Sequence, residues 1–153
     1  MSASNAAASA ADDSSVTAFS WNVRVYYEDT DAGGVVFYAN YLKFFERART
    51  EWLRAMGYYQ HTLVQTEGIM FVVKNTSVDY FSPARLDDEL KLSVVVEKQR
   101  NASLEFLQEA WRVNGAEQTL LARGRITVVC VGAASFRPQA IPQEMLACIQ
   151  RAL

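Results

Sequence analysis

One long amphipathic helix followed by four long strand-like segments is the feature that most constrains the fold of this sequence. From about Phe37 to Met56, apolar side chains recur at steps of three, four and seven residues, at Tyr41, Phe44, Phe45, Ala48, Trp52, Ala55 and Met56. This spacing predicts one helix of about five turns. Gly57 follows the last periodic residue and is suited to a left-handed C-terminal cap. The apolar face of the helix is wide enough to need cover on most sides.

Patterns typical of β-strands precede and follow this helix. FSWNVRVYYED alternates apolar and polar side chains from Phe19 onward, which predicts a strand. After the helix comes a connector with a short helical turn near residues 61–66, and then four further strand patterns: IMFVVKNTSVDYF, ELKLSVVVEKQR, SLEFLQEAWRV and QTLLARGRITVVCV. The Asn114-Gly115 pair predicts a hairpin and SPARLDD predicts a loop, so we expect a mainly antiparallel sheet.

The order of these elements, one helix after the first of five strands, predicts an α+β architecture. The apolar helix face and one sheet face are both buried only if the sheet wraps around the helix. We therefore expect the hotdog fold, an antiparallel sheet of about five strands around one long central helix. A single curved sheet leaves an exposed edge strand, which predicts at least a dimer.

The chain of 153 residues has room for one domain with a flanking segment at each end. The first 18 residues contain almost no large apolar side chains, so we expect a disordered leader over residues 1–18. The folded domain is expected over residues 19–137. Pro138 and Pro142 interrupt the strand pattern, so residues 138–153 form a tail in which PQEMLACIQRAL predicts a short helix.

Composition excludes several classes of function. The net charge is −2 and no basic run is present, which disfavours nucleic-acid binding. No apolar stretch approaches the roughly 18 residues of a membrane span, and no basic residue precedes Arg24, so we expect no transmembrane segment, no signal peptide and a cytoplasmic location. One histidine and two cysteines at no metal-ligand spacing predict no metal site. Carboxylates, hydroxyls and backbone donors remain as candidate catalytic groups.

The segment just before the long helix concentrates acidic residues. Glu28, Asp29 and Asp31 lie beside the Gly33-Gly34 pair. In a structural interpretation, one aspartate caps the helix and the others are solvated. In a functional interpretation, one carboxylate is a base or nucleophile and the free N–H groups of the first helical turn form an oxyanion hole.

The stretch DTDAGGVVFYANYLKFFERARTEWLR resembles the signature of the 4-hydroxybenzoyl-CoA thioesterase family. It is most similar to the YbgC-type acyl-CoA thioesterases, which are encoded with the Tol–Pal envelope system. GYYQ, VDYFSPARLDDEL and ASLEF also resemble that subfamily, so the similarity extends roughly over residues 22–131. The resemblance implies a hotdog fold, dimers that associate into tetramers, no metal and hydrolysis of an acyl-CoA thioester. Coenzyme A is then part of the substrate, and no separate cofactor is expected.

The resemblance also implies catalytic groups. The catalytic carboxylate of the family is the second aspartate of its D-x-D pair, which falls on Asp31, with Asp29 as the alternative. The family's oxyanion donor is a backbone N–H at the start of the central helix, and the matching position is Tyr38. Many YbgC-type members have histidine there, whereas FYAN in this chain resembles the 4-hydroxybenzoyl-CoA branch.

Substrate binding is assigned to two places. Gly33, Gly34 and Val35 lie beside the expected thioester, where glycines permit a sharp turn and leave room next to the backbone. Related thioesterases carry phosphate-binding basic residues in the region of EKQRNAS, so Lys98 and Arg100 are expected to bind the phosphates of coenzyme A. Arg100 can do so through paired donors. The alternative is a solvated strand end.

The other polar residues of this region have mainly structural interpretations. We expect Asn40 to hydrogen-bond within its own helix turn, with fixation of the aspartate loop as the alternative. Glu46 and Arg49 are three residues apart on the helix and can pair. Glu46 is also the next candidate carboxylate, because a carboxylate on this helix is catalytic in other hotdog branches. Structural roles are expected for the sole histidine and both cysteines, His61, Cys130 and Cys148.

Together these features predict an acyl-CoA thioesterase in which Asp31 attacks the thioester carbonyl or activates a water, while the Tyr38 N–H binds the oxyanion. Two alternatives remain: a hotdog hydroxyacyl-thioester dehydratase, and a non-catalytic acyl-carrier or envelope-complex adaptor. The expected partners are acyl-CoA and further copies of the chain in a homodimer or homotetramer, with an acyl carrier protein as an additional option. The inner face of the inner membrane is the alternative location.

Overall fold

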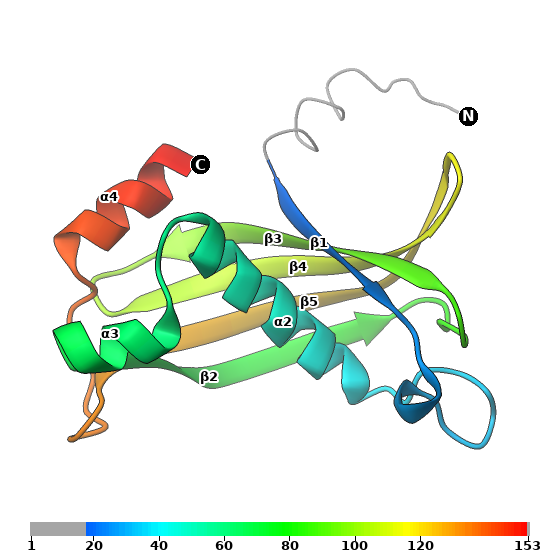
Figure 1. Cartoon of the computed structure of the whole chain (residues 1–153), viewed down its shortest axis with the longest axis horizontal. Helices are drawn as coiled ribbons and strands as arrows, with labels where there is room; N and C mark the ends of the chain where they lie inside the picture. Colours follow the sequence, from blue (N-terminus) through cyan, green and yellow to red (C-terminus); the bar gives the residue numbers. More distant parts are fainter. Residues whose placement is uncertain (1–17, 153) are drawn as a thin grey trace.

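The computed structural model describes residues 18–152, so the leader expected over residues 1–18 lies outside them except for its last residue. The sheet consists of β1 (Phe19–Arg24), β2 (Ile69–Tyr80), β3 (Glu89–Gln99), β4 (Ser103–Asn114) and β5 (Glu117–Gly132). The helices are α2 (Asn40–Ala55), α3 (Gln60–Glu67) and α4 (Gln143–Ala152), with a short 3-10 turn at Tyr27–Asp29. Figure 1 shows this arrangement.

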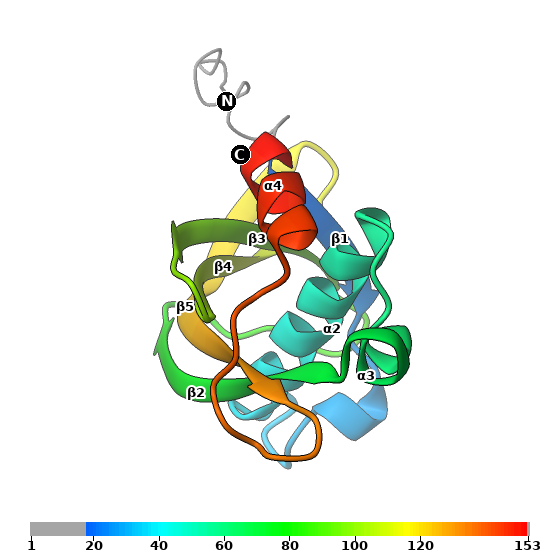
Figure 2. The ribbon, with the colours of Figure 1, turned by 90° about the vertical axis from the view of Figure 1, so that its left-hand side faces the viewer.

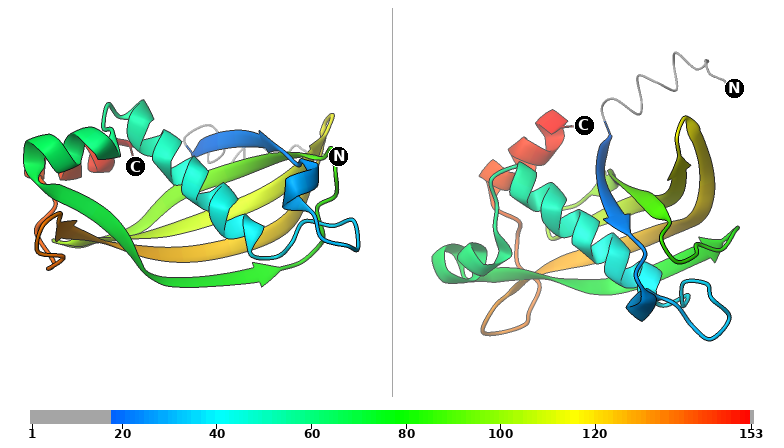
Figure 3. Two further views of the ribbon diagram at one scale, coloured as in Figure 1. Left: turned by 60° about the horizontal axis from the view of Figure 1, so that its bottom comes forward. Right: turned by 45° about the vertical axis from the view of Figure 1, so that its right-hand side comes forward.

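The five strands form one antiparallel sheet in the order β1-β3-β4-β5-β2. The sheet curves around α2, which lies across its concave face (Figures 1 and 3). This is the hotdog fold, and the predicted fold class is confirmed. Strands β1 and β2 are the two edges of the sheet.

Helix α2 follows the predicted periodicity from Tyr41 to Trp52, but it begins at Asn40 instead of about Phe37. At its C-terminal end the prediction is wrong, because Ala55 is exposed and Leu53 is the buried residue. Tyr38 and Ala39 form a turn ahead of the helix. The predicted cap at Gly57 is confirmed, because this residue has φ = +91° and its N–H donates to the Arg54 carbonyl at 2.9 Å. The start of the helix is therefore separated from the last strand residue, Arg24, by the loop that carries the candidate site.

The buried face of α2 is packed directly on the sheet backbone. Tyr41, Phe44, Phe45, Ala48, Trp52 and Leu53 are buried on this face. At Gly124 in β5, an added Cβ would lie 3.0 Å from Cε2 of Phe45. A glycine here lets the Phe45 ring lie against the strand, which explains a glycine in the interior of a long strand.

Inward-facing residues of β3 and β4 alternate with outward-facing ones, as predicted for strands with one buried face. Buried residues are Leu90, Leu92, Val94 and Val96 in β3, and Leu104, Phe106, Gln108 and Ala110 in β4. The hairpin predicted at Asn114-Gly115 is confirmed, since Asn114 pairs with Glu117 and Gly115 has φ = +65°. Gln108 is the one polar member of this buried set.

Helix α4 lies in the segment where a terminal helix was expected, at the end of the sheet that also carries α3 (Figure 2). Ile141, Met145 and Ile149 are buried to 1% exposure or less and belong to the main hydrophobic core. The Leu146 N–H donates to the Pro142 carbonyl at 3.0 Å, which places the proline at the first turn. The C-terminal helix is therefore a packed part of the domain.

Neither a membrane-spanning helix nor a metal-binding cluster is found within residues 18–152. No helix there is both long enough and apolar enough to cross a membrane. No group of three or more histidine, cysteine, aspartate or glutamate side chains in this range is arranged to hold a metal ion.

The packing of α4 leads to a stability prediction. Ile149→Ala should lower the free energy of unfolding by about 2–5 kcal/mol, because it leaves a cavity in the core. Gln150→Ala, at the exposed neighbouring position, should change it by less than about 0.5 kcal/mol. Chemical denaturation of both variants measures the difference. Equal losses in the two variants would show that α4 contributes nothing to the core.

Candidate active site

Asp31 lies at the tip of a short two-stranded turn between β1 and α2. Thr30 and Val36 form a β-bridge, and the Asp31 N–H donates to the Val35 carbonyl at 2.9 Å. The side chain is exposed, and its Oδ1 accepts the Gly33 N–H at 2.8 Å. Oδ2 has no hydrogen-bond partner among residues 18–152. The carboxylate is thus oriented through one oxygen and open through the other.

The residues assigned to substrate binding next to Asp31 shape this turn. Gly34 has φ = +80°, a conformation that strains any residue with a side chain. At Gly33, an added Cβ would lie 3.2 Å from Asp31 Oδ1. Val35 is half-buried and forms a β-bridge with Arg85. All three residues adjoin the Asp31 carboxylate or its backbone, and their contact with substrate stays a prediction.

Asp29, the alternative carboxylate, has a different environment. Its side chain is only 9% exposed, and its Oδ2 accepts the Tyr26 N–H at 2.9 Å. Its backbone carbonyl accepts the Phe37 N–H at 2.9 Å. Asp29 therefore ties the two arms of the loop together, whereas Asp31 is presented to solvent.

Asn40 adds a further bond to the same loop. Its Nδ2 donates to the Asp29 carbonyl at 2.7 Å. The expectation that Asn40 bonds within its own helix turn is wrong, and the alternative of fixing the aspartate loop is correct. The physical reason is that the loop folds back over the start of α2, which brings the Asp29 carbonyl within reach of the Asn40 amide.

The turn just before α2 presents free backbone donors. Within residues 18–152 no side chain forms a cap hydrogen bond at the start of this helix, so the structural interpretation in which an aspartate caps it is wrong. The N–H groups of Tyr38 and Ala39 donate to no acceptor within residues 18–152. Unpaired donors at a helix start stabilise a negative charge. The Tyr38 N–H and the Asp31 carboxylate thus lie on one loop, each with capacity for a ligand.

Lys98 and Arg100 lie at the other end of the sheet. Arg24, just before the Asp31 loop, pairs with Glu89 at the start of β3. Lys98 and Arg100 lie at the far end of β3, roughly 30 Å away at the rise of an extended strand. Both side chains are exposed. Within one subunit these cations do not reach the Asp31 loop, and their phosphate-binding role stays a prediction.

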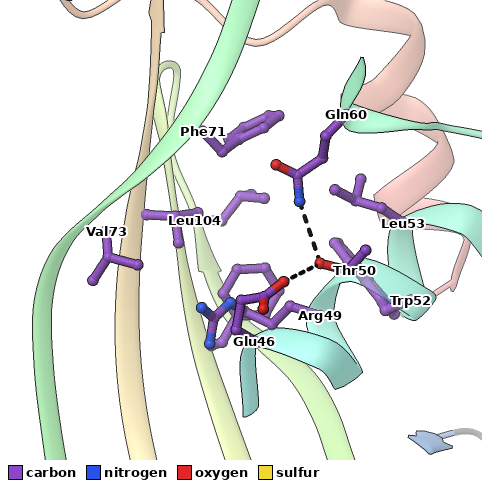
Figure 4. Close-up of a pocket in the computed structure, with 11 residues that line it drawn as sticks. Glu46, Arg49, Thr50, Trp52, Leu53, Gln60, Phe71, Val73 and Leu104 are labelled. Atoms are coloured by element: carbon purple, nitrogen blue, oxygen red, sulfur yellow. Dashed lines mark hydrogen bonds between the residues drawn. The ribbon is translucent and has the colours of Figure 1, made fainter. Parts of the chain in front are cut away.

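A cavity of about 140 Å³ lies between α2 and the sheet (Figure 4). Its apolar walls include Leu53, Phe71, Val73, Leu104, Phe106 and Val128. Its polar side is formed by Glu46, Arg49, Thr50 and Gln60. The Thr50 hydroxyl donates to Glu46 at 2.6 Å, and Gln60 donates to the Thr50 hydroxyl at 3.4 Å. The cavity is thus suited to a compact apolar group with a polar neighbour.

The polar side of this cavity continues into the core. Arg49 Nη1 donates to Oε1 of the fully buried Gln108 at 2.8 Å, and Gln108 Nε2 donates to the Phe45 carbonyl at 3.1 Å. The ion pair that the spacing of Glu46 and Arg49 allows is not formed within residues 18–152, since Arg49 is directed into the core toward Gln108. Burial lowers the pKa of the Arg49 guanidinium, and nearby Glu46 opposes that shift.

The sole histidine and the cysteines lie away from the Asp31 loop. His61 is exposed on α3. Cys130 is buried in β5, and burial raises the pKa of its thiol, which disfavours the thiolate that a nucleophile needs. Cys148 is half-buried on α4, and both thiols are free.

Comparison with known proteins identifies the family. The fold is similar to that of a 1,4-dihydroxy-2-naphthoyl-CoA thioesterase from Synechocystis, with a TM-score of 0.78 and 23% identity, covering 87% of this chain and 96% of that one. Residues 25–149 match the model of the thioesterase-like superfamily. The chain belongs to this superfamily.

Curated relatives agree with this family. The chain is 47% identical over 131 residues to the acyl-CoA thioester hydrolase YbgC of Escherichia coli O6:H1, which covers 86% of this chain and 95% of the relative. It is 44% identical over 129 residues to the acyl-CoA thioesterase YbgC of Haemophilus influenzae, which covers 84% and 92%. The resemblance drawn from the DTDAGG stretch is confirmed.

Two polar residues near these sites, Gln108 and Tyr80, have no role that was predicted from the sequence. Gln108 occupies an inward position of β4 between Phe106 and Ala110, and this break in the apolar alternation is a signal that could have identified it. Tyr80 donates its hydroxyl to the Tyr38 carbonyl at 2.9 Å. These two residues are 42 positions apart, and no local pattern indicates their contact.

The Asn40 bond leads to a prediction about the loop. Asn40→Ala should reduce stability by about 1 kcal/mol, the typical contribution of one hydrogen bond. It should also increase backbone amide exchange over residues 29–36, because the Asp29 carbonyl loses a donor. Hydrogen–deuterium exchange with mass spectrometry measures this, with Asn101→Ala in the exposed β3–β4 turn as control. Unchanged exchange in the loop would contradict the role given to Asn40.

Proposed function

We propose that this protein hydrolyses acyl-CoA thioesters to a free acid and coenzyme A, with Asp31 as nucleophile or general base and the Tyr38 N–H as oxyanion donor. One observation carries the proposal: an open carboxylate and an unoccupied helix-start N–H belong to a single, multiply bonded loop. The YbgC relatives are acyl-CoA thioester hydrolases, which supports the same reaction here.

In the nucleophilic route, Asp31 Oδ2 attacks the thioester carbonyl. The C–S bond then breaks, coenzyme A leaves as the thiolate, and a mixed anhydride with Asp31 remains. Water hydrolyses the anhydride, which releases the acid and restores the carboxylate. Oδ2 is the suitable atom because Oδ1 already accepts the Gly33 N–H.

In the general-base route, the same oxygen takes a proton from a water that attacks the carbonyl directly. The C–S bond then breaks, coenzyme A leaves as the thiolate and the acid forms without a covalent enzyme intermediate. The proton held by Asp31 passes to the thiolate or to solvent, which restores the carboxylate. Both routes pass through a tetrahedral intermediate with a negative oxygen. The Tyr38 N–H and the positive end of the α2 dipole would stabilise that oxygen.

The proposed chemistry requires no cofactor beyond the coenzyme A of the substrate. The Asp31 carboxylate supplies the attacking or accepting atom, and the backbone supplies the oxyanion donor. A thioester carried by acyl carrier protein presents the same reacting group, so that protein is a further possible substrate carrier.

We also propose that the protein is at least a homodimer joined along β2. This strand is an edge of the sheet, and Val73 and Tyr80 on it are 53% and 44% exposed. An exposed edge with apolar side chains favours pairing with another strand. Two-fold pairing of β2 with a second copy is antiparallel, so the Ile69 end of one strand lies beside the Tyr80 end of the other.

This dimer would complete the site. The cavity adjoins the Ile69 half of β2 through Phe71 and Val73, whereas the Asp31 loop is joined to the Tyr80 end. Antiparallel pairing therefore brings the cavity of one subunit toward the Asp31 loop of the other. A volume of about 140 Å³ is close to that of an apolar cavity that binds benzene, which suits a short or single-ring acyl group.

The same two-fold symmetry supports a substrate-binding role for Lys98 and Arg100. These residues lie at the end of the sheet that also holds the cavity-bearing half of the subunit. In the dimer they lie toward the same end as the Asp31 loop of the other subunit. We propose that they bind the phosphates of coenzyme A across the subunit boundary.

The catalytic assignment is tested by Asp31→Asn. The variant keeps the shape of the side chain but cannot form the anhydride or accept a proton at neutral pH, so kcat should fall by at least about 100-fold. Its melting temperature should change little, since the side chain is exposed. Thiol release from acetyl-, butyryl-, palmitoyl- and benzoyl-CoA measures activity, with Glu28→Gln on the same loop as the control.

Three outcomes would contradict the proposal. Parent-like activity of Asp31→Asn would place the catalytic carboxylate elsewhere, with Glu46 the next to test. Hydration of crotonyl-CoA without thiol release would indicate a dehydratase. Binding of acyl-CoA without turnover of any ester would indicate a non-catalytic adaptor.

The oligomer is tested by multi-angle light scattering at micromolar concentration. The chain has a mass of about 17 kDa, and we expect a species of at least twice that value. Val73→Lys places a charge on the β2 edge and should shift the protein toward monomer. A parent protein that scatters as a monomer would exclude the composite site.

A further inference from the structure

Tyr80 connects the end of β2 to the turn that begins α2. Its hydroxyl donates to the Tyr38 carbonyl at 2.9 Å. Its ring makes edge contacts with the rings of Tyr38 and Tyr41, at centroid distances of 6.2 and 5.4 Å. Three aromatic rings thus surround a single polar contact to the backbone of Tyr38.

This contact restrains the residue that carries the Tyr38 N–H. In a helical turn, the N–H and the C=O of one residue point toward opposite ends of the helix axis. The Tyr38 carbonyl and the Tyr38 N–H belong to adjacent peptide units that join at the Tyr38 Cα. Holding the carbonyl therefore restricts rotation about the Tyr38 backbone bonds, which limits the directions that the Tyr38 N–H can take. The carbonyl's other bond, from the Tyr41 N–H, is long at 3.4 Å. The Tyr80 hydroxyl is therefore the shorter contact that holds this residue in place.

We propose that Tyr80 is a positioning residue for thioester hydrolysis, which fixes the Tyr38 residue so that its N–H is aimed at the oxyanion. This inference rests on the proposed function and adds a residue to it. Tyr80 touches neither the thioester nor Asp31, and it acts through the backbone of Tyr38. A donor directed before the reaction stabilises developing charge without reorganisation.

The protonation state of Tyr80 suits this role. Although the residue is 44% exposed, partial desolvation of its hydroxyl raises the pKa of Tyr80 above its ordinary value of 10.0. The hydroxyl therefore keeps its proton throughout the neutral range and remains a donor. The bond to the Tyr38 carbonyl is then independent of pH where thioester hydrolysis is measured.

Tyr41 offers a matched control in the same aromatic cluster. Its hydroxyl accepts the Ala84 N–H at 3.3 Å, and its side chain is 2% exposed. Tyr41→Phe removes a tyrosine hydroxyl and one hydrogen bond, as Tyr80→Phe does, but leaves the Tyr38 carbonyl untouched. A purely structural role for Tyr80 predicts that the two variants behave alike.

The kinetic test compares kcat and KM of both variants on the ester of the four-member panel that the parent hydrolyses fastest. Tyr80→Phe should lower kcat about tenfold and change KM by less than about twofold, because a misdirected donor weakens transition-state binding alone. Tyr41→Phe should keep the parent kcat even where its melting temperature falls as much or more.

A spectroscopic test follows the bond itself. Tyr38-Ala39 is the only Tyr-Ala pair in the chain, so ¹³C-carbonyl tyrosine combined with ¹⁵N-alanine gives one signal for the Tyr38 carbonyl. Tyr80→Phe should shift this signal, since its carbonyl loses a hydrogen bond. Tyr41→Phe should leave it in place.

Each outcome decides the proposal. Parent-like kcat in Tyr80→Phe overturns it, as does an equal fall of kcat in both variants. A lower kcat without a shift of the Tyr38 carbonyl signal also overturns it, because Tyr80 would then affect catalysis without acting through the Tyr38 backbone. If Asp31→Asn remains active, the assignment of Asp31 as the catalytic carboxylate is wrong. A lower kcat together with a shifted Tyr38 carbonyl signal in Tyr80→Phe would still support the role of Tyr80.

Discussion

The packing of α2 against the concave face of the sheet determines the position of everything else in this protein. The contact is close: a Cβ at position 124 of β5 would lie only 3.0 Å from Cε2 of Phe45, so a side chain there would displace the ring. The sheet surrounds the apolar face of the helix and fixes the direction of its axis. The first turn of α2 then lies at one end of the sheet, beside the ends of β1 and β2 (Figures 1 and 3). The loop that joins β1 to α2 therefore meets the end of β2 at the same place.

The Asp31 loop is held by groups that do not touch the substrate in the proposed chemistry. Asp29, Asn40 and Tyr80 each form a hydrogen bond to its backbone or to the adjoining helix start. Asp29 and Asp31 are two residues apart, yet one is buried and bonded and the other is exposed with a free oxygen. A division of this kind separates the residue that stabilises the loop from the residue that can react.

The two ends of the sheet carry different parts of the proposed thioesterase site. One end has the Asp31 loop and the backbone donors before α2, and the other has the cavity, with Lys98 and Arg100 at the end of β3. A single subunit keeps these parts apart, because they lie at opposite ends of strands about ten residues long. Two-fold pairing along β2 is the arrangement that would bring them together, which links the proposed activity to assembly.

Local patterns in the sequence were enough to predict the fold class, the central helix and its glycine cap, the strands and the hairpin at Asn114-Gly115. These features follow from side-chain periodicity and turn residues, which act over a few positions. The resemblance of the DTDAGG stretch likewise identified the family. The start of α2, the role of Asn40, the partner of Arg49 and the contact of Tyr80 with Tyr38 were decided by tertiary structure. Each depends on groups from segments that come together only when the sheet encloses the helix. The same enclosure decides that Asp29 is buried and that Asp31 stays exposed, which two neighbouring aspartates in a sequence do not reveal.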